Sequence, residues 1–512
     1  MNTTVLILVI LTVIYVPLWF YVWKHPNLLS KGLEKYGPVI KINSRFGIRF
    51  IDRFSKYHRF WSAFGTFSQI VSLFLMVMMV YIMVFAVLRI PSMMSRGGVG
   101  IEYVLAIPGL NPLLPFWYGL AGLIIALVCH EMAHGLQSKS NGVDVKHTGL
   151  LYGVLPLGAF VEPDEEQVQA ASRRTKLHLY TAGITTNFVI AAIAFLLFST
   201  VLLGGVNSPY DDKCAVYSVV SGSPVDGTIP AGVIITEING TQFDYTDGYY
   251  DTPLSYVNAG ELNTVSYVDS SGTKYSKDVV WGNYIVNTAS DGPASDLKDT
   301  WMRSVVYKGT TYYFYTAQGF SKFMGITHPG DELTVNYSKM NGGTLDNTLS
   351  ATYTLGTKGS IGYLGVYSTT SGMQIITPGT VKEMGANPLY GATDISSAAN
   401  SLLQYISMPF QGFDPVPENL QWWYGDLGDL FWVVCQLLYW IFWLNLLLGI
   451  TNALPAFPFD GGYVLLGWVD AIYERLGVKD PEERNRRAGE LTNNVSTLFL
   501  FMFMLVIIVA LI

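Results

Sequence analysis

Six long apolar stretches set what this chain can fold into. Because a helix needs about 20 mainly apolar residues to cross a bilayer, each stretch has about the length of one transmembrane helix. Only 13% of the residues are charged, whereas soluble proteins have about 25%. The sequence therefore predicts an α-helical polytopic membrane protein with about six transmembrane helices. The stretches are 3–23, 66–90, 116–138, 179–204, 428–453 and 493–512.

The remaining composition excludes several classes of protein. A net charge of −7 gives no basic surface for nucleic acid. The 27 Phe, 32 Tyr and 12 Trp are too many for a disordered chain. Cys129, Cys214 and Cys435 are too far apart in the sequence for a disulfide framework or a cysteine zinc site. We therefore expect the lipid bilayer and membrane proteins as partners, and no nucleic acid.

The distribution of Lys and Arg along the chain predicts its orientation in the membrane, because cytoplasmic loops are enriched in these residues. Residues 24–59 contain nine Lys and Arg beside two acidic residues, and further basic clusters at 173–176 and 475–487 fall on the same side. The stretch 205–420 falls on the other side, with 20 Asp and Glu against 10 Lys and Arg. We expect the N-terminus and this stretch to be extracytoplasmic. Because the chain has so few cysteines, we expect it to lie in a prokaryotic cell membrane, either bacterial or archaeal.

The extracytoplasmic region 206–425 contains short β-type runs separated by Gly, Ser and Asn. Gly222-Ser223-Pro224, followed by 231–240 and 259–268, resembles a PDZ domain, and a weaker similarity follows at 290–294 and 329–335. We expect two PDZ-like units, at about 212–282 and 284–357, or one unit with an insertion. A PDZ fold binds an extended peptide as an added strand. A β-rich shield for the membrane part is the other interpretation.

The apolar span 116–138 contains the sequence His130-Glu131-Met132-Ala133-His134. One helical turn separates the two histidines, so both project from one face. Two imidazoles at this spacing can share a tetrahedral zinc ion, with Glu131 beside them as a general base. Histidines that line a polar seam are the alternative. Ionisable residues inside an apolar span are costly and usually mark function, so we favour the metal site.

Zinc needs a third protein ligand, with the fourth position left for water. Asp460 is the candidate at a suitable depth, because nearby prolines and glycines let the chain turn back after the span 428–453. Asp460 as the N-cap of a helix is the alternative. At 1.5 Å per residue, His130 and Asn187 lie roughly 12 Å from the cytoplasmic ends of their spans. Asn452 enters from the same side, so we expect one polar layer near the cytoplasm.

These residues resemble the motifs of the site-2 protease family of intramembrane zinc metalloproteases. The resemblance covers roughly 116–205 and 428–475, and a PDZ insertion between the two halves is also typical of the family. Phe459 stands where the family often has Leu, and Ile184 where Pro is common; both changes concern substrate fit. The matching pieces are 130–134, Ala182-Gly183-Ile184-Thr185-Thr186-Asn187, and 445–452 running into Pro455, Pro458 and Asp460-Gly461-Gly462.

The resemblance implies one Zn²⁺ ion per chain, held by His130, His134 and Asp460, with Glu131 as general base. It also implies that Asn452 helps to stabilise the oxyanion. Asn187 either contacts the substrate or hydrogen-bonds between helices. Residues 142–165 alternate like a β-hairpin, which the family similarly places near the active site. An unwound substrate can add there as an edge strand, and a plain cytoplasmic connector is the alternative.

The chain thus divides into four parts, and the predicted function is hydrolysis of peptide bonds in or near transmembrane segments of single- or few-span membrane proteins. The alternative is a catalytically inactive, membrane-anchored PDZ scaffold. A transporter requires repeated halves with broken helices, which are not seen, and a tethered soluble zinc protease conflicts with the apolar run 123–129. The oligomeric state is left open. The parts are 1–115 (N-terminal helices, basic loop and a re-entrant segment at 101–115), 116–205 (first catalytic half), 206–425 (PDZ-like region) and 426–512 (second catalytic half).

Overall fold

The chain folds into two compact units in the computed structural model. The first unit comprises residues 1–202, 394–413 and 433–512, and the second comprises residues 203–393 and 414–432. The first is mainly helical and the second mainly β-sheet. The structure describes residues 3–25, 32–91, 108, 111–154, 156–248, 254–290, 292–341, 344–411 and 416–511.

Five helices within the described residues are long and apolar enough to cross a membrane. Residues 9–24 of α1 (Thr3–Lys24) form a further, shorter apolar helix. The protein is therefore a polytopic membrane protein, as the apolar stretches predict. The five are α3 (His58–Leu88), α6 (Phe116–Ser140), the helical run that begins with α8 (Arg173–Leu196), α12 (Asp429–Asn452) and α14 (Pro481–Leu511).

Three of these helices begin before the apolar stretch that predicts them. α3, α8 and α14 start at residues 58, 173 and 481, ahead of the expected 66, 179 and 493. A helix does not have to begin where its apolar run begins, because polar residues also form helix. At the start of α8, the Ser172 side chain accepts a hydrogen bond from the backbone N–H of Thr175. Most of the expected re-entrant segment 101–115 lies outside the described residues.

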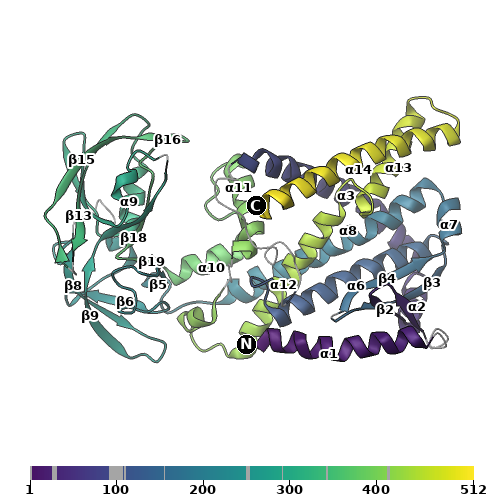
Figure 1. The fold of residues 1–512 in the computed structure, drawn as a ribbon, viewed down its shortest axis with the longest axis horizontal. Helices are drawn as coiled ribbons and strands as arrows, with labels where there is room; N and C mark the ends of the chain where they lie inside the picture. Colours follow the sequence, from purple (N-terminus) through teal and green to yellow (C-terminus); the bar gives the residue numbers. More distant parts are fainter. Residues whose placement is uncertain are drawn as a thin grey trace. The chain divides into compact units, whose positions relative to one another are not determined.

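Helix α8 occupies the middle of the first unit, packed against α3, α6 and α13 (Asp460–Arg475) (Figure 1). One buried cluster joins Leu75 of α3, Ile184 of α8 and Ile450 of α12 with Leu454 in the following loop. Helices α13 and α14 also pack together. Segments on both sides of the β-rich insertion thereby share one core.

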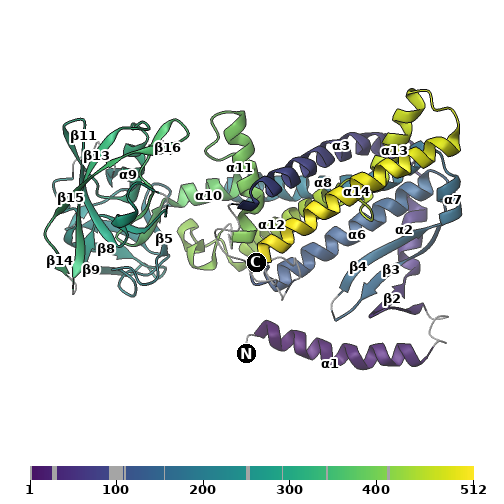
Figure 2. The same ribbon diagram turned by 45° about the horizontal axis from the view of Figure 1, so that its top comes forward.

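A four-stranded antiparallel sheet adjoins the helices of the first unit (Figure 2). In the stretch 142–165 lie β3 (Val145–Tyr152) and β4 (Pro156–Pro163), which pair as a hairpin. The basic loop adds a second hairpin, β1 (Leu33–Tyr36) and β2 (Val39–Asn43), followed by helix α2 (Arg45–Phe54). The strand order β1-β2-β3-β4 leaves β4 at one edge, beside α6. The short helix α7 (Glu165–Ala170) follows.

The second unit contains one 13-stranded sheet with two separate hydrophobic cores. The first core spans residues 214–281 and also takes Met373 and Ile375; the second spans residues 285–364. The PDZ identity of these parts stays a prediction. The strands are β5 (Cys214–Val219), β6 (Ile234–Ile238), β7 (Thr241–Gln242), β8 (Glu261–Val268), β9 (Lys274–Trp281), β10 (Asn283–Thr288), β11 (Thr300–Tyr307), β12 (Thr310–Tyr313), β13 (Glu332–Asn341), β14 (Thr344–Leu345), β15 (Leu349–Thr354), β18 (Val366–Thr370) and β19 (Met373–Ile376).

Shorter elements complete the two units. Within the second, β16 (Gly356–Lys358) and β17 (Ile361–Tyr363) form a separate two-stranded sheet, and α9 (Ala317–Met324) and α10 (Pro378–Ala386) are its α-helices among the described residues. Helix α11 (Ile395–Ser407) belongs to the first unit. Trp443 of α12 donates a hydrogen bond to the backbone carbonyl of Ile406, which fixes α11 against α12.

Candidate active site

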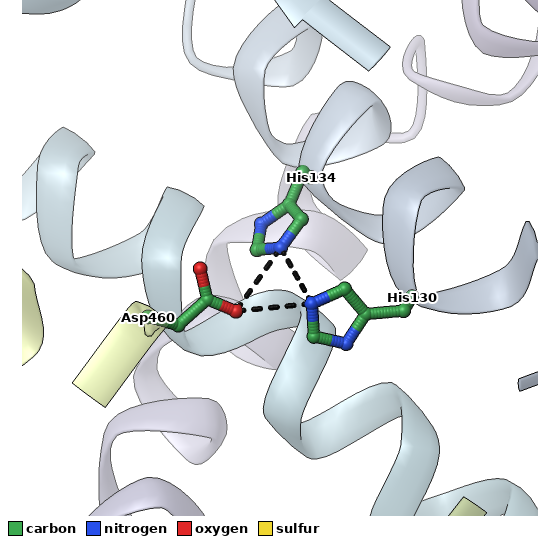
Figure 3. Close-up of side chains that lie close together, drawn as sticks. All are labelled: His130, His134 and Asp460. Atoms are coloured by element: carbon green, nitrogen blue, oxygen red, sulfur yellow. Dashed lines mark hydrogen bonds and ion pairs between the residues drawn. The ribbon is translucent and has the colours of Figure 1, made fainter. Parts of the chain in front are cut away.

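Two histidines of α6 and one carboxylate of α13 meet between the helices (Figure 3). The Nε2 atoms of His130 and His134 are 3.1 Å apart. One carboxylate oxygen of Asp460 lies 3.1 Å from Nε2 of His130 and 3.2 Å from Nε2 of His134. The two histidines are only 5% and 8% exposed. Three potential ligand atoms thus form a triangle in a buried place.

The triangle has the dimensions of a metal site. Nitrogen and oxygen ligands about 2.0–2.1 Å from a tetrahedral ion lie roughly 3.3 Å from one another. The three distances observed here are close to that value. On the far side of its ring, Nδ1 of His134 lies 2.8 Å from the backbone carbonyl oxygen of Leu179. Such a second contact fixes the ring so that Nε2 faces the metal position.

Asp460 reaches the triangle because α13 starts in very close contact with the loop before it. A Cβ atom on Gly461 would lie 2.3 Å from the carbonyl oxygen of Leu454, and one on Gly462 would lie 2.7 Å from the carbonyl carbon of Ala456. Only glycine fits at both positions. Asp460 is the first residue of the helix and Phe459 is its N-cap, so the N-cap alternative for Asp460 is not what the structure has.

Gly183 of α8 closes the site from a third side. A Cβ atom at this position would lie 2.6 Å from Cε1 of His130 and 2.6 Å from Nε2 of His134, a separation that real side chains do not reach. The histidine motif gives no sign of this contact. The available signal is the glycine of the segment 182–187, which resembles a motif of the family, although that resemblance assigns no contact to Gly183.

Glu131 follows the first histidine and is half-buried, and its carboxylate is directed to the sheet. Its Oε2 atom accepts a hydrogen bond of 3.2 Å from the backbone N–H of Val161 in the edge strand β4. That N–H is therefore directed at α6. The contact links the candidate base to the sheet edge, and sequence reasoning did not single out Val161.

Asn452 and Asn187 lie on neighbouring helices but outside the triangle. The side-chain amide of Asn452 donates to the carbonyl oxygen of Leu448 in its own helix, at 3.0 Å. Asn187 is fully buried, and neither polar atom of its side chain has a hydrogen-bond partner among the described residues. A Cβ on Gly449 would lie 3.4 Å from Cβ of Asn187. Asn187 therefore sits at the contact of α8 and α12 without a bond between helices.

Apolar helices that enclose two histidines and a carboxylate define a polytopic membrane protein with a possible metal centre between its helices. The model of peptidase family M50 matches residues 118–503, which is most of the chain. The chain belongs to peptidase family M50, and the predicted membership of the site-2 protease family is confirmed.

Two curated relatives are similar to parts of the chain. An uncharacterised protein of Methanocaldococcus jannaschii is 28% identical over 254 residues, which is 49% of this chain and 64% of that protein. A membrane-bound transcription factor site-2 protease homolog of Arabidopsis thaliana is 28% identical over 128 residues, which is 24% of this chain and 25% of that protein. The chain thus covers less than two thirds of the length of either relative.

Proposed function

We propose that this protein is an intramembrane zinc metalloprotease that hydrolyses peptide bonds in or near the transmembrane segments of single- or few-span membrane proteins. The observation that carries the proposal is the buried triangle of His130, His134 and Asp460 between membrane-spanning helices. Two imidazoles and a carboxylate are a donor set that zinc accepts in hydrolases, with the fourth position left open. Membership of peptidase family M50 points to the same reaction.

The three residues of the triangle would hold the ion. When bound, zinc lowers the pKa of a coordinated water toward about 7 and polarises the peptide carbonyl. The contact between Nδ1 of His134 and Leu179 keeps the ring oriented. Asp460 sits on a helix start that the glycines hold in place, so the site is organised before any ligand enters.

Glu131 would be the general base. It lies on the same helix as both histidines, next to His130, and its carboxylate would leave Val161 to act on the water. It then takes a proton from the attacking water and returns it to the leaving amine. Asn452 contributes a donor to the oxyanion after leaving its bond to Leu448. Asn187, buried without a partner, is the residue we assign to substrate contact.

The substrate would bind as an extended strand along β4. A peptide inside a helix hides its carbonyl groups, so the bond to be cleaved must first unwind. Strand β4 is the last strand of the sheet among the described residues, so its outer edge offers backbone groups to such a segment. Because the Val161 N–H lies at this edge and contacts Glu131, a strand bound there passes directly beside the base.

From the basic clusters we infer that the active site lies near the cytoplasmic side, and that the N-terminus and residues 206–425 lie outside the cytoplasm. In this orientation the PDZ-like region would act on the extracytoplasmic parts of substrates, as a filter against bulky ones or as a dock for a trimmed end. The lipid bilayer is the medium of the reaction.

The zinc content of the purified protein tests the metal site on which the proposal depends. We expect about one zinc per chain in protein purified in detergent without chelator, and a sharp loss in Asp460→Ala and in His134→Ala. Asp429→Ala and His147→Ala are matched controls, because both side chains are exposed and neither is part of the triangle. A folded wild-type protein without zinc would contradict the proposal and favour the inactive scaffold.

Substitution of the base separates metal binding from catalysis. Glu131→Gln should keep the zinc content of the wild type, since Glu131 is no part of the triangle, and should lower cleavage of a single-span model substrate by about 10²–10⁴-fold. The measurement is the initial rate of cleavage in detergent, with and without a chelator. A Glu131→Gln variant as active as the wild type would rule out this role for Glu131.

A further inference from the structure

An apolar cavity lies beside Glu131, and part of its wall comes from a segment that precedes the family match at residue 118. Its volume is about 420 Å³, within the range of about 300–1,000 Å³ that is typical of ligand pockets. Helix α2 forms one wall, α6 the second and strands β3 and β4 the third. The principal apolar side chains are Phe46, Phe50, Val128, Met132, Leu150 and Phe160.

The cavity adjoins the reacting groups and the sheet edge at once. Glu131 and Val161, which are hydrogen-bonded to each other at 3.2 Å, both line it. A peptide strand along the outer edge of β4 would pass this pair. Because side chains alternate to opposite faces along a strand, one of them would enter the cavity while its neighbour points away.

The position of the cavity favours a substrate side chain over a lipid chain as its occupant. A lipid chain needs only an apolar surface. A substrate strand must also lie beside the general base and the backbone donors of the strand edge, and this cavity adjoins both. The Phe46 and Phe50 rings are still 71% and 38% exposed. They offer apolar surface that an entering side chain would cover, with the hydrophobic gain that this burial gives.

We propose that this cavity binds one large apolar side chain of the substrate, aromatic or branched aliphatic, next to the bond that is cleaved. Phe46 and Phe50 of α2 set the size of side chain that is accepted. The inference rests on the proposed protease function and adds a specificity-determining element from outside the matched region. The basic segment 24–59 thereby has a role in substrate choice.

The test uses a single-span model substrate whose cleavage site has been mapped by mass spectrometry with the wild-type enzyme. The residues flanking the cleaved bond are then varied among Gly, Ala, Leu, Phe and Trp. We expect Phe50→Ala to raise kcat/KM for Trp relative to Leu by about tenfold, because the cavity becomes larger. Phe50→Trp should shift the ratio in the opposite direction, which a general loss of folding cannot do.

Tyr36→Ala is the control. Tyr36 lies on strand β1 of the same sheet, is 63% exposed, and does not line the cavity. It should leave the ratio unchanged. Equal ratios in the wild type, Phe50→Ala and Phe50→Trp would overturn the pocket assignment and leave the protease function standing. A wild type that cleaves none of the model substrates with zinc present would overturn both.

A second readout needs no turnover. Cys129 lines the cavity and is partly exposed, whereas Cys214 and Cys435 are buried. Modification of Cys129 by N-ethylmaleimide should be lost when the Phe-containing model substrate is bound, and retained with the Gly-containing one. Equal protection by both substrates would contradict a side-chain pocket at this place.

Discussion

At the residue scale, Gly183 decides how closely α8 can approach the two histidines. The imidazoles of His130 and His134 occupy the space that any side chain at this position would need. Glycine inside a helix costs about 0.5–1 kcal/mol relative to alanine, so this residue weakens its own helix. The close approach of the helix backbone to the ligands offsets that cost.

Gly183→Ala should therefore reduce zinc binding without unfolding the protein. The added methyl group forces both imidazoles to move, and overpacking of this kind costs about 1–3 kcal/mol. We expect zinc per chain to fall well below one, measured by elemental analysis of a detergent-purified sample. Gly489→Ala is the control, because nothing lies within 4 Å of the Cβ it would add to α14. Full zinc content in Gly183→Ala would show that α8 can move away from the histidines, and would contradict this role of Gly183.

At the element scale, an ion-pair cluster joins α8, α13 and α14. Asp470 of α13 accepts hydrogen bonds from Nη1 of Arg173 and from Nε of Arg484, each at 2.7 Å. Arg173 and Arg484 also pair with Glu474, one turn further along α13. The cluster fixes the end of α13 that is distant from Asp460, so it helps to hold the carboxylate ligand in register with the histidines.

Asp470→Asn should lower the thermal unfolding midpoint by several degrees, because it removes the charge that two arginines share. Glu490→Gln, in the pair Arg486–Glu490 whose side chains are 57% and 61% exposed, is the control. It should have almost no effect, since exposed pairs contribute little. Both midpoints can be measured by fluorescence in detergent. Equal midpoints for the two variants would show that the cluster does not stabilise α13.

At the scale of the whole molecule, the two ends of the β-rich stretch of the second unit lie next to each other. The backbone N–H of Gly379 donates to the carbonyl oxygen of Asp211, at 3.2 Å. The first core needs Met373 and Ile375 as well as residues 214–281. A deletion of residues 212–357 would therefore remove β10 and β5, with which β18 and β19 pair. Strands β18 and β19 would be left behind without these partners.

Replacement of residues 212–376 by a short Gly-Ser linker should remove both cores together and leave the membrane helices intact. We expect zinc content to be unchanged and cleavage of a substrate without an extracytoplasmic domain to continue. Discrimination against a substrate with a bulky extracytoplasmic domain should be lost. The measurement is the ratio of the two cleavage rates; an unchanged ratio would refute the filter role. An internal control is the zinc content of the shortened protein.

Local sequence patterns determined much of this protein. Each long apolar stretch indicates a membrane-spanning helix by itself, because a bilayer imposes a length of about 20 residues on any span. The spacing of His130 and His134 places both on one helix face through the period of the helix alone. The prolines and glycines around Asp460 already indicate a turn there. These features depend only on neighbours in the chain.

Only the tertiary structure decided which distant residues meet. Asp460 lies more than 300 residues after His134, and its position depends on how α13 packs on α8 and on the preceding loop. The contact of Gly183 with the histidines and the bond between Val161 and Glu131 likewise arise between elements. The hairpin and α2 in the basic loop join a sheet whose other strands come from residues 145–163. Such contacts follow from the packing of whole elements, which local periodicity does not encode.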